Sequence, residues 1–204
     1  SNIESEVNVH ESNDLILLPL PNGENVLFRF VQAPIMSPIL SAKYPNIKTY
    51  LGESIDHKMT MRFNYNPELG FHAMIMGQTD VIFIDPYSFH NNNYIISYYK
   101  KNYENDTKRE FHEEAPISSP DYEEYLEYKA ANPINQKNRS SGEHLKSYRI
   151  AIACTQQYSN FHGGTTEETL DAIVTTMNRI NQVYETELAI RLILVDNNDS
   201  LINL

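Results

Sequence analysis

A histidine followed directly by a glutamate is the pair of residues with the most specific chemistry in this sequence. A zinc peptidase site needs two histidines four residues apart on a helix, with a glutamate after the first as general base. His10-Glu11 and His112-Glu113 both lack a histidine four residues further on. No other pair of histidines has ligand spacing. The sequence therefore predicts no catalytic residue, no metal-ligand residue and no complete zinc site within its 204 residues.

Three other groups of residues carry weaker signals. His162 precedes Gly163-Gly164 at a predicted helix start, which could bind an anion, but we favour a tight turn before a capped helix. The D-N-N-D-S run from Asp196 lacks the glycine and glutamate of a calcium loop and predicts a turn. Cys154 is the single cysteine, which excludes an intrachain disulfide. Its apolar neighbours predict an inert thiol in a buried strand.

The elements that would position these residues begin with a β-rich part. Strands are predicted at Asp14–Leu20, Val26–Val31, Met59–Tyr65, Phe71–Met76, Val81–Ile84 and Tyr94–Tyr103. In Met59–Tyr65, apolar side chains alternate with polar ones such as Arg62, which predicts one face in the core and one in solvent. Gly77-Gln78 predicts a hairpin, and Asp85-Pro86 predicts a strand end. Short strands spaced about ten residues apart favour an antiparallel sandwich or barrel, interrupted by one short helix that Ser37-Pro38 begins.

The C-terminal part has a different pattern. Arg149–Thr155 is almost entirely apolar and predicts a strand buried on both faces. Thr165 and Glu168 form a capping box before a helix, whose apolar face is Leu170, Ile173, Val174, Met177, Ile180 and Tyr184. Ala189–Val195 predicts a second strand, parallel to the first. Two strands and one helix bury too little apolar surface for a stable core, so we expect this domain to continue past Leu204.

Between the two parts lies an acidic, proline-punctuated stretch. From Glu104 to Lys129 there are nine acidic and three basic residues, with a short helix predicted near Tyr122–Ala130. The polar segment that follows offers basic residues to a processing protease: Lys137, Arg139 and Lys146. The predicted class is α+β, with an antiparallel β-rich domain at residues 1–110, a linker at 111–147 and an incomplete βαβ segment at 148–204.

Charge and hydropathy exclude two classes of partner. The net charge of −11 argues against nucleic acid and anionic membrane surfaces, because both bind basic patches. No segment reaches the ~18 consecutive apolar residues that a membrane-spanning helix requires.

Residues 148–202 also resemble a known family. The pieces YRIAIACT, FHGGT, AIVTTMNRINQVYE and VDNND occur in the order found at the start of the catalytic domain of reprolysin-like metallopeptidases from Bacteroidetes-type bacteria. Residues 19–103 resemble the pro-region of the same family in PLPNG, MSPIL, YPNIKTYLG, GFHAMI, IDPY and YYKKNY. Together the two resemblances cover about two-thirds of the chain.

The resemblance implies a metzincin fold whose catalytic zinc is held by H-E-x-x-H-x-x-G-x-x-H. None of those residues occurs here, so the resemblance implies zinc in the full-length enzyme and none in this chain. It also implies that Tyr148–Thr155, Thr166–Leu188 and Ala189–Val195 are the first strand, helix and second strand of the catalytic domain. The expected partners are the rest of that domain and peptide or protein substrates. The expected location is secreted or cell-surface, with the signal peptide absent from these residues.

Two hypotheses follow. In the first, the chain is a zymogen fragment whose β-rich part assists folding and keeps the peptidase latent. In the second, it is a secreted β-sandwich that binds glycan or protein without peptidase activity. For latency, Asp106 and Asp121 are candidate zinc ligands because they precede the expected cut. Alternatively, these acidic residues are only solvated charges of a linker. Latency could then also come from purely steric blocking of the active site.

Overall fold

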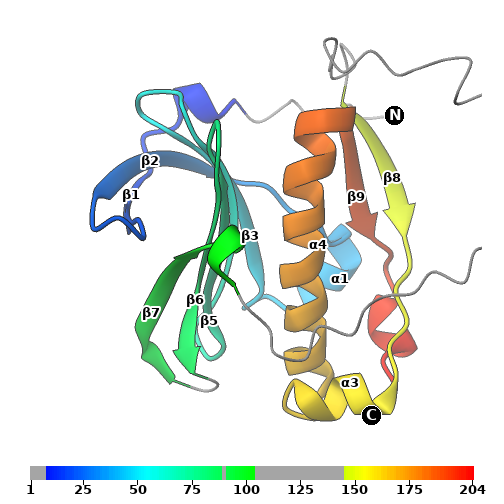
Figure 1. The fold of residues 1–204 in the computed structure, drawn as a ribbon. Coiled ribbons are helices and arrows are strands. Elements are labelled where there is room, and N and C mark those ends of the chain that lie inside the picture. The colour runs from blue at the N-terminus through cyan, green and yellow to red at the C-terminus, as the bar shows by residue number, and fades with distance from the viewer. Residues whose placement is uncertain (1–7, 89–90, 104–144) are drawn as a thin grey trace, which may run out of the picture. The chain divides into compact units, whose positions relative to one another are not determined.

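Alternating apolar residues produce a seven-stranded antiparallel sheet in the N-terminal part. The computed structural model describes residues 8–88, 91–103 and 145–204. The sheet consists of β1 (Leu15–Pro19), β2 (Asn25–Gln32), β3 (Lys48–Ser54), β4 (Thr60–Asn66), β5 (Gly70–Met76), β6 (Val81–Ser88) and β7 (Asn91–Tyr99). Each strand pairs with the next along the chain, so the strand order is the sequence order. The described residues thus form one curved meander instead of the expected sandwich or closed barrel (Figure 1).

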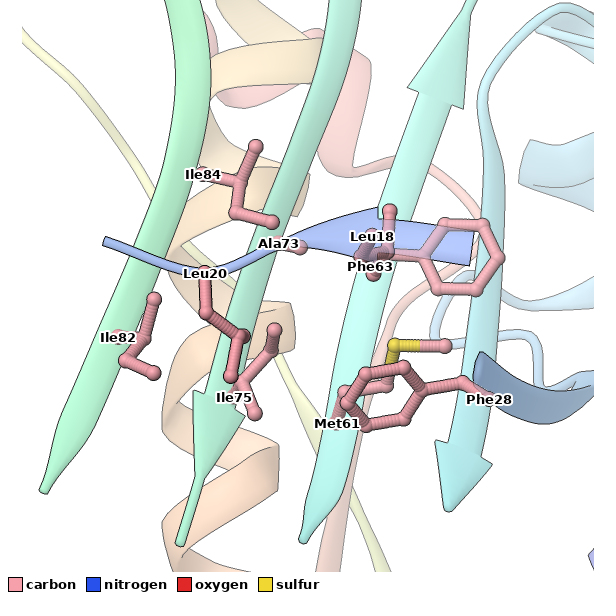
Figure 2. Close-up of a cluster of buried hydrophobic side chains, with 9 residues drawn as sticks. All are labelled: Leu18, Leu20, Phe28, Met61, Phe63, Ala73, Ile75, Ile82 and Ile84. Atoms are coloured by element: carbon pink, nitrogen blue, oxygen red, sulfur yellow. The ribbon is translucent and has the colours of Figure 1, made fainter. Parts of the chain in front are cut away.

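The inner face of this sheet carries the first apolar core. The chain of β1 crosses over the strands that follow, so Leu18 and Leu20 pack against side chains of β4, β5 and β6 (Figure 2). The buried members are Leu18, Leu20, Phe28, Met61, Phe63, Ala73, Ile75, Ile82 and Ile84. Tyr50 stacks on Phe63 with ring centroids 4.6 Å apart. The opposite face of the sheet carries polar side chains, among them Arg62 and Asn64.

The strand ends differ from the sequence prediction in two places. β6 continues through Asp85-Pro86 to Ser88 with a register shift at Pro86, because a bulge tolerates a residue without an amide hydrogen. The predicted strand Tyr94–Tyr103 begins earlier and ends at Tyr99, followed by a 3₁₀ turn η2 (Lys100–Asn102). β3 has no counterpart among the predicted strands. Another 3₁₀ turn, η1 (Val9–Glu11), precedes β1.

Helix α4 (Thr166–Leu188) has the bounds that the resemblance implied. Thr165 caps it by accepting from the amide of Glu168, as the capping box predicts. The Glu168 carboxylate also accepts from the Thr165 hydroxyl. Ala189 ends it in the left-handed conformation at φ 52°. A shorter helix, α3 (Gln156–Phe161), precedes it.

Two parallel strands flank α4, as predicted. β8 (Lys146–Ile150) pairs in parallel with β9 (Ile190–Leu194). The predicted strand Arg149–Thr155, buried on both faces, is wrong: β8 begins and ends earlier, and most of it is exposed. The apolar run beyond it is half-buried. Ile152 and Cys154 turn inward, whereas the small side chains of Ala151 and Ala153 lie in solvent.

The second apolar core combines residues from both ends of the described chain. Helix α1 (Pro38–Lys43), capped by Ser37 as predicted, packs with α4 and β9. The buried members are Ile35, Met36, Leu40, Ile47, Leu170, Ile173, Val174, Met177 and Leu194. Helix α4 thus lies between the large sheet and the β8–β9 pair (Figure 1). The predicted helix at Tyr122–Ala130 lies outside the described residues.

Candidate functional site

The face of α4 that meets the large sheet is polar and buried. Asp171, Thr175, Asn178 and Gln182 are all at most 9% exposed, and they form a stripe at helical spacing. Opposite them, β4 presents Arg62, Asn64 and Asn66, each 1% exposed. We call this contact the α4–sheet interface.

Arg62 is the centre of this interface. Its side chain is 0% exposed, and Nη2 and Nε donate to the two carboxylate oxygens of Glu185 at 2.6 and 3.3 Å. Nη1 donates to the amide oxygen of Asn178 at 3.0 Å. Arg191 of β9 donates to the same carboxylate at 2.6 Å. Burial lowers the pKa of Arg62 more than Glu185 raises it, yet an arginine stays charged throughout the accessible pH range.

Neutral hydrogen bonds extend the interface along β4. The Asn64 amide donates to the Thr175 hydroxyl at 2.8 Å. The Gln182 amide donates to the Thr60 hydroxyl, also at 2.8 Å. These bonds satisfy buried polar groups that would otherwise destabilise the contact, and they fix the register of the helix on the strand.

A second charged cluster surrounds Asp85 of β6. His72 Nδ1 lies 2.7 Å from one carboxylate oxygen, and the Tyr98 hydroxyl donates to the other at 2.8 Å. Arg179 of α4 forms an ion pair with the same carboxylate and stacks over the Phe83 ring. Burial raises the pKa of Asp85, but His72, Arg179 and Tyr98 together outweigh it and hold that pKa below its usual value.

Asp171 is a buried carboxylate of the interface whose charge is only partly compensated. Burial raises its pKa to about 6, and the opposing effects of His72 and Asn66 do not compensate. One of its carboxylate oxygens has no hydrogen-bond partner. Burial, and to a smaller extent the charge of His72, lowers the pKa of His162. Near Asp171 and His162, burial therefore disfavours the charged form of both side chains.

The prediction that the polar face of Met59–Tyr65 lies in solvent is therefore wrong. The alternation in this strand predicted that Arg62 and Asn64 face solvent, because polar side chains are usually exposed. In the structure they are buried because α4 supplies a partner for each. The signal that could have identified this contact is the polar stripe Thr175, Asn178, Gln182, Glu185, spaced at three and four residues on the helix side away from its apolar face.

The N-terminal part also completes the edge of β9. Leu194 donates its amide to the carbonyl of Ile35 at 2.8 Å and accepts from the amide of Ser37 at 3.0 Å. Met36 therefore bridges Leu194 in parallel. Further along the same edge, the side chain of Asn181 donates to and accepts from the backbone of Leu192. On the edge of β9 that does not pair with β8, the backbone groups of Leu192 and Leu194 thus have hydrogen-bond partners.

The residues singled out by sequence fall in different places. Asp106, Asp121, Lys137 and Arg139 lie outside the described residues. Lys146 is the exposed first residue of β8, and its amide donates to the carbonyl of Ala189 at 2.8 Å.

Other sequence signals have structural roles. His162 ends α3, and Gly163 and Gly164 follow with positive φ angles, which agrees with the preferred turn. The Asp196 run leads into a 3₁₀ turn, η3 (Asn198–Leu201), as expected for a turn. Cys154 is only partly buried, and its sulfur lies 3.5 Å from the Ser159 hydroxyl, so it is not the mid-strand buried thiol that we predicted.

The residues present do not fit a peptidase zinc centre. No H-E-x-x-H occurs anywhere in the sequence. Within the described ranges, three potential ligands converge only at His10, Glu53 and His57, which come from a turn and a hairpin and lack the helical spacing. The described residues therefore do not form a site for zinc-dependent hydrolysis. The α4–sheet interface instead holds the N-terminal sheet and α4 together through ion pairs and hydrogen bonds.

Comparisons with known proteins agree with the C-terminal resemblance. Residues 145–202 match the family model for the metallo-peptidase family M12B, reprolysin-like. The matched segment contains β8, α3, α4 and β9, and peptidases of this family depend on zinc. Neither curated proteins nor solved structures gave a match to the chain. No helix in the described part is long and apolar enough to cross a membrane.

Proposed function

We propose that this chain belongs to a secreted reprolysin-like zinc metallopeptidase, with residues up to about 110 as its pro-region and residues from β8 onward as the start of its catalytic domain. The match at residues 145–202 supports the second half of this proposal. The peptidase zinc site would then lie outside residues 1–204. A full-length sequence without H-E-x-x-H-x-x-G-x-x-H would refute the peptidase assignment.

The observation that carries the proposal is the shared apolar core. Ile35 and Leu40 are 0% exposed, and both are buried against α4 and β9. A βαβ unit of this size buries too little apolar surface by itself. The pro-region supplies the missing strand at Ile35–Ser37 and the missing helix at α1, so it acts as a folding template for the first elements of the catalytic domain.

The α4–sheet interface explains how such a template could be released. A pro-region must separate from its enzyme after cleavage, and each surface must then be soluble. Permanent interfaces are more apolar than transient ones. Here the broad contact with α4 consists of polar groups, of which Arg62, Asn64, Asn178 and Thr175 are hydrogen-bonded across it, whereas the apolar contact is confined to the short segment around α1. The balance suits a non-covalent complex that persists after the linker is cut and that can later separate into two soluble parts.

Latency would come from the acidic linker, and here the proposal rests on sequence alone. Asp106 or Asp121 would ligate the zinc and displace the attacking water. Cys154 is a poor alternative because it lies in the catalytic half, bridged to Ile202. In the full-length zymogen, Asp106→Ala or Asp121→Ala should activate the enzyme prematurely, with Cys154→Ser as the comparison. Activation by Cys154→Ser alone would exclude both aspartates.

The pairing of the two parts can be tested in the full-length protein after a cut at a site-specific protease sequence inserted between Lys137 and Arg139. We expect the N-terminal fragment to co-elute with the remainder on size exclusion and to suppress peptidase activity. Leu40→Ala should weaken this retention, whereas Ile39→Ala, on the exposed side of the same helix, should not. A fragment that separates at once without any change in activity would contradict the proposal.

The rival assignment, a glycan-binding or protein-binding module, has one observation in its favour. Tyr87 and Tyr94 on β6 and β7 are 71% and 68% exposed, and exposed aromatic rings commonly form binding surfaces. This assignment leaves the α4–sheet interface unexplained. Loss of glycan-array binding in a Tyr87→Ala/Tyr94→Ala variant, in a protein without peptidase activity, would favour it.

A further inference from the structure

Two histidines and a glutamate converge beside the β3–β4 hairpin. His10 Nδ1 lies 3.1 Å from one carboxylate oxygen of Glu53, and His57 Nδ1 lies 3.2 Å from the other. The two imidazole rings are 5.4 Å apart between centroids. One ligand atom from each residue lies within 4.8 Å of the other two. We propose that His10, Glu53 and His57 bind one divalent transition metal ion, with Zn²⁺ the best match.

The ligand type and spacing support this choice. Two imidazole nitrogens and one carboxylate oxygen form a set that suits zinc, whereas calcium and magnesium prefer oxygen ligands alone. Zinc bonds of about 2.0–2.1 Å in a tetrahedron place neighbouring ligand atoms about 3.3 Å apart. The separations of 3.1 and 3.2 Å run to different oxygens of Glu53, and the three ligand atoms lie within 4.8 Å of one another, so metal binding would draw the side chains inward onto one ion.

Each ligand is held by its own backbone contacts. The amide of His10 donates to the side chain of Asn8, and the carbonyl of His10 accepts from Arg29 at 2.6 Å. Glu53 belongs to β3, and its side chain is 18% exposed. The amide of His57 donates to the carbonyl of Ser54 at 2.9 Å. These contacts fix the backbone at the three ligands, while the His10 and His57 side chains are 60% and 65% exposed and can adjust to an ion.

His57 has a positive φ, which is uncommon for residues other than glycine, although histidine is among those that adopt it more often. Its φ is 58°, in the left-handed region, where glycine or asparagine is usual in a tight turn. The turn therefore costs more with histidine than with glycine. A ligand role for the imidazole would account for a histidine at this position.

Space for further coordination is available. The three residues and Arg29 line a cavity of about 210 Å³, which is large enough for a water molecule as the fourth ligand. The ion would link the turn η1, ahead of β1, to the β3–β4 hairpin. It is separate from the family's catalytic zinc, because Glu53 and His57 lie in a strand and a turn instead of on one helix. The sequence predicted no metal-ligand residue, and no sequence motif connects His10 to Glu53 and His57.

Isothermal titration of the 204-residue chain with ZnCl₂ at pH 7.5 tests the site, together with the visible absorption of added Co²⁺. We expect one ion per chain and a tetrahedral cobalt spectrum. Loss of a group that merely supports a metal ligand costs about 10–100-fold in affinity, so His10→Ala, Glu53→Gln and His57→Gly should each weaken binding at least about 100-fold. Asp80→Asn, a carboxylate paired with Lys101 in another turn, serves as the control and should bind normally.

His57→Gly also separates a folding defect from a lost ligand. Glycine adopts the left-handed conformation freely, so this variant should match or exceed the metal-free melting temperature of the natural chain. It should nevertheless lose the rise in melting temperature that Zn²⁺ causes in the natural chain. Absence of stoichiometric binding, or binding within threefold of the natural affinity in a His10→Ala/His57→Gly double variant, would overturn the proposal. In that case the contacts are ordinary histidine–carboxylate hydrogen bonds.

Discussion

Replacing Glu185 by glutamine tests whether the α4–sheet interface is closed as described. The substitution keeps the size and shape of the side chain and removes only its charge. Arg62 would then remain buried, without the carboxylate that now accepts from two of its nitrogens. Arg191 would lose the same partner, so two guanidinium groups would face a neutral amide.

The expected cost follows from burial. Breaking a buried ion pair by removing one partner typically costs about 3–5 kcal/mol, because an uncompensated charge remains, whereas exposed pairs contribute about 0–1 kcal/mol. The Arg62 side chain is 0% exposed and that of Glu185 is 12% exposed, so the buried figure applies. Arg62→Met should cost less than Glu185→Gln, because Glu185 keeps Arg191 as a partner. The double variant should cost less than the sum of the two.

Urea-induced unfolding of the 204-residue chain provides the measurement. Glu187→Gln makes the same charge change on an exposed side of the same helical turn and should alter the free energy of unfolding by no more than an exposed pair contributes, about 0–1 kcal/mol. If Glu185→Gln costs no more than Glu187→Gln, the ion pair is solvated, and α4 does not cover Arg62.

Three further results are expected. Leu40→Ala, at a fully buried position, should lower the free energy of unfolding by about 2–5 kcal/mol, whereas Ile39→Ala should change it little. Burial raises the pKa of Asp171 from 3.8 to about 6, so the folded state binds that proton more tightly than the unfolded state. The free energy of unfolding should therefore fall as the pH rises from about 4 to about 6. Asp171→Asn should abolish this fall in pH-dependent unfolding and stabilise the chain at pH 8 by up to about 3 kcal/mol. Limited trypsin digestion followed by mass spectrometry should find the first cut at residues 132–145 and not after Lys146, whose strand pairing protects it; an earliest cut in Val26–Tyr103 would contradict the boundary.

The periodicity of apolar residues predicted the elements in which apolar side chains are buried and polar side chains are exposed. Met61 and Phe63 of β4 and the apolar stripe of α4 point to the cores, and the capping box at Thr165 located the helix start. β3 was missed because its buried residues are Thr49, Gly52 and Ser54, which carry no apolar alternation. A side chain at position 52 would collide with Met61, since a Cβ there would lie 2.5 Å from the Met61 methyl group.

The interface itself could not be predicted from local pattern. Polar side chains are buried there only because partners in a distant segment satisfy them, and a single strand or helix shows half of each pair. Arg62 and Glu185 are each typical of a solvated surface, and only their meeting makes them interior residues. The same limit applies to His10, Glu53 and His57, which no sequence motif connects. Residues from distant segments that meet only in the folded chain are therefore the ones that local sequence patterns do not reveal.

The bridge between Met36 and Leu194 has a consequence for synthesis on the ribosome. The meander from β1 to β7 is built from contacts between neighbouring strands, so it can fold as it emerges, before β8 has been translated. The Ile35–Ser37 edge and α1 would then already be in place when α4 and β9 appear. A permuted chain that began with residues 145–204 would reverse this order and leave the apolar faces of α4 and β9 uncovered while the rest was being made.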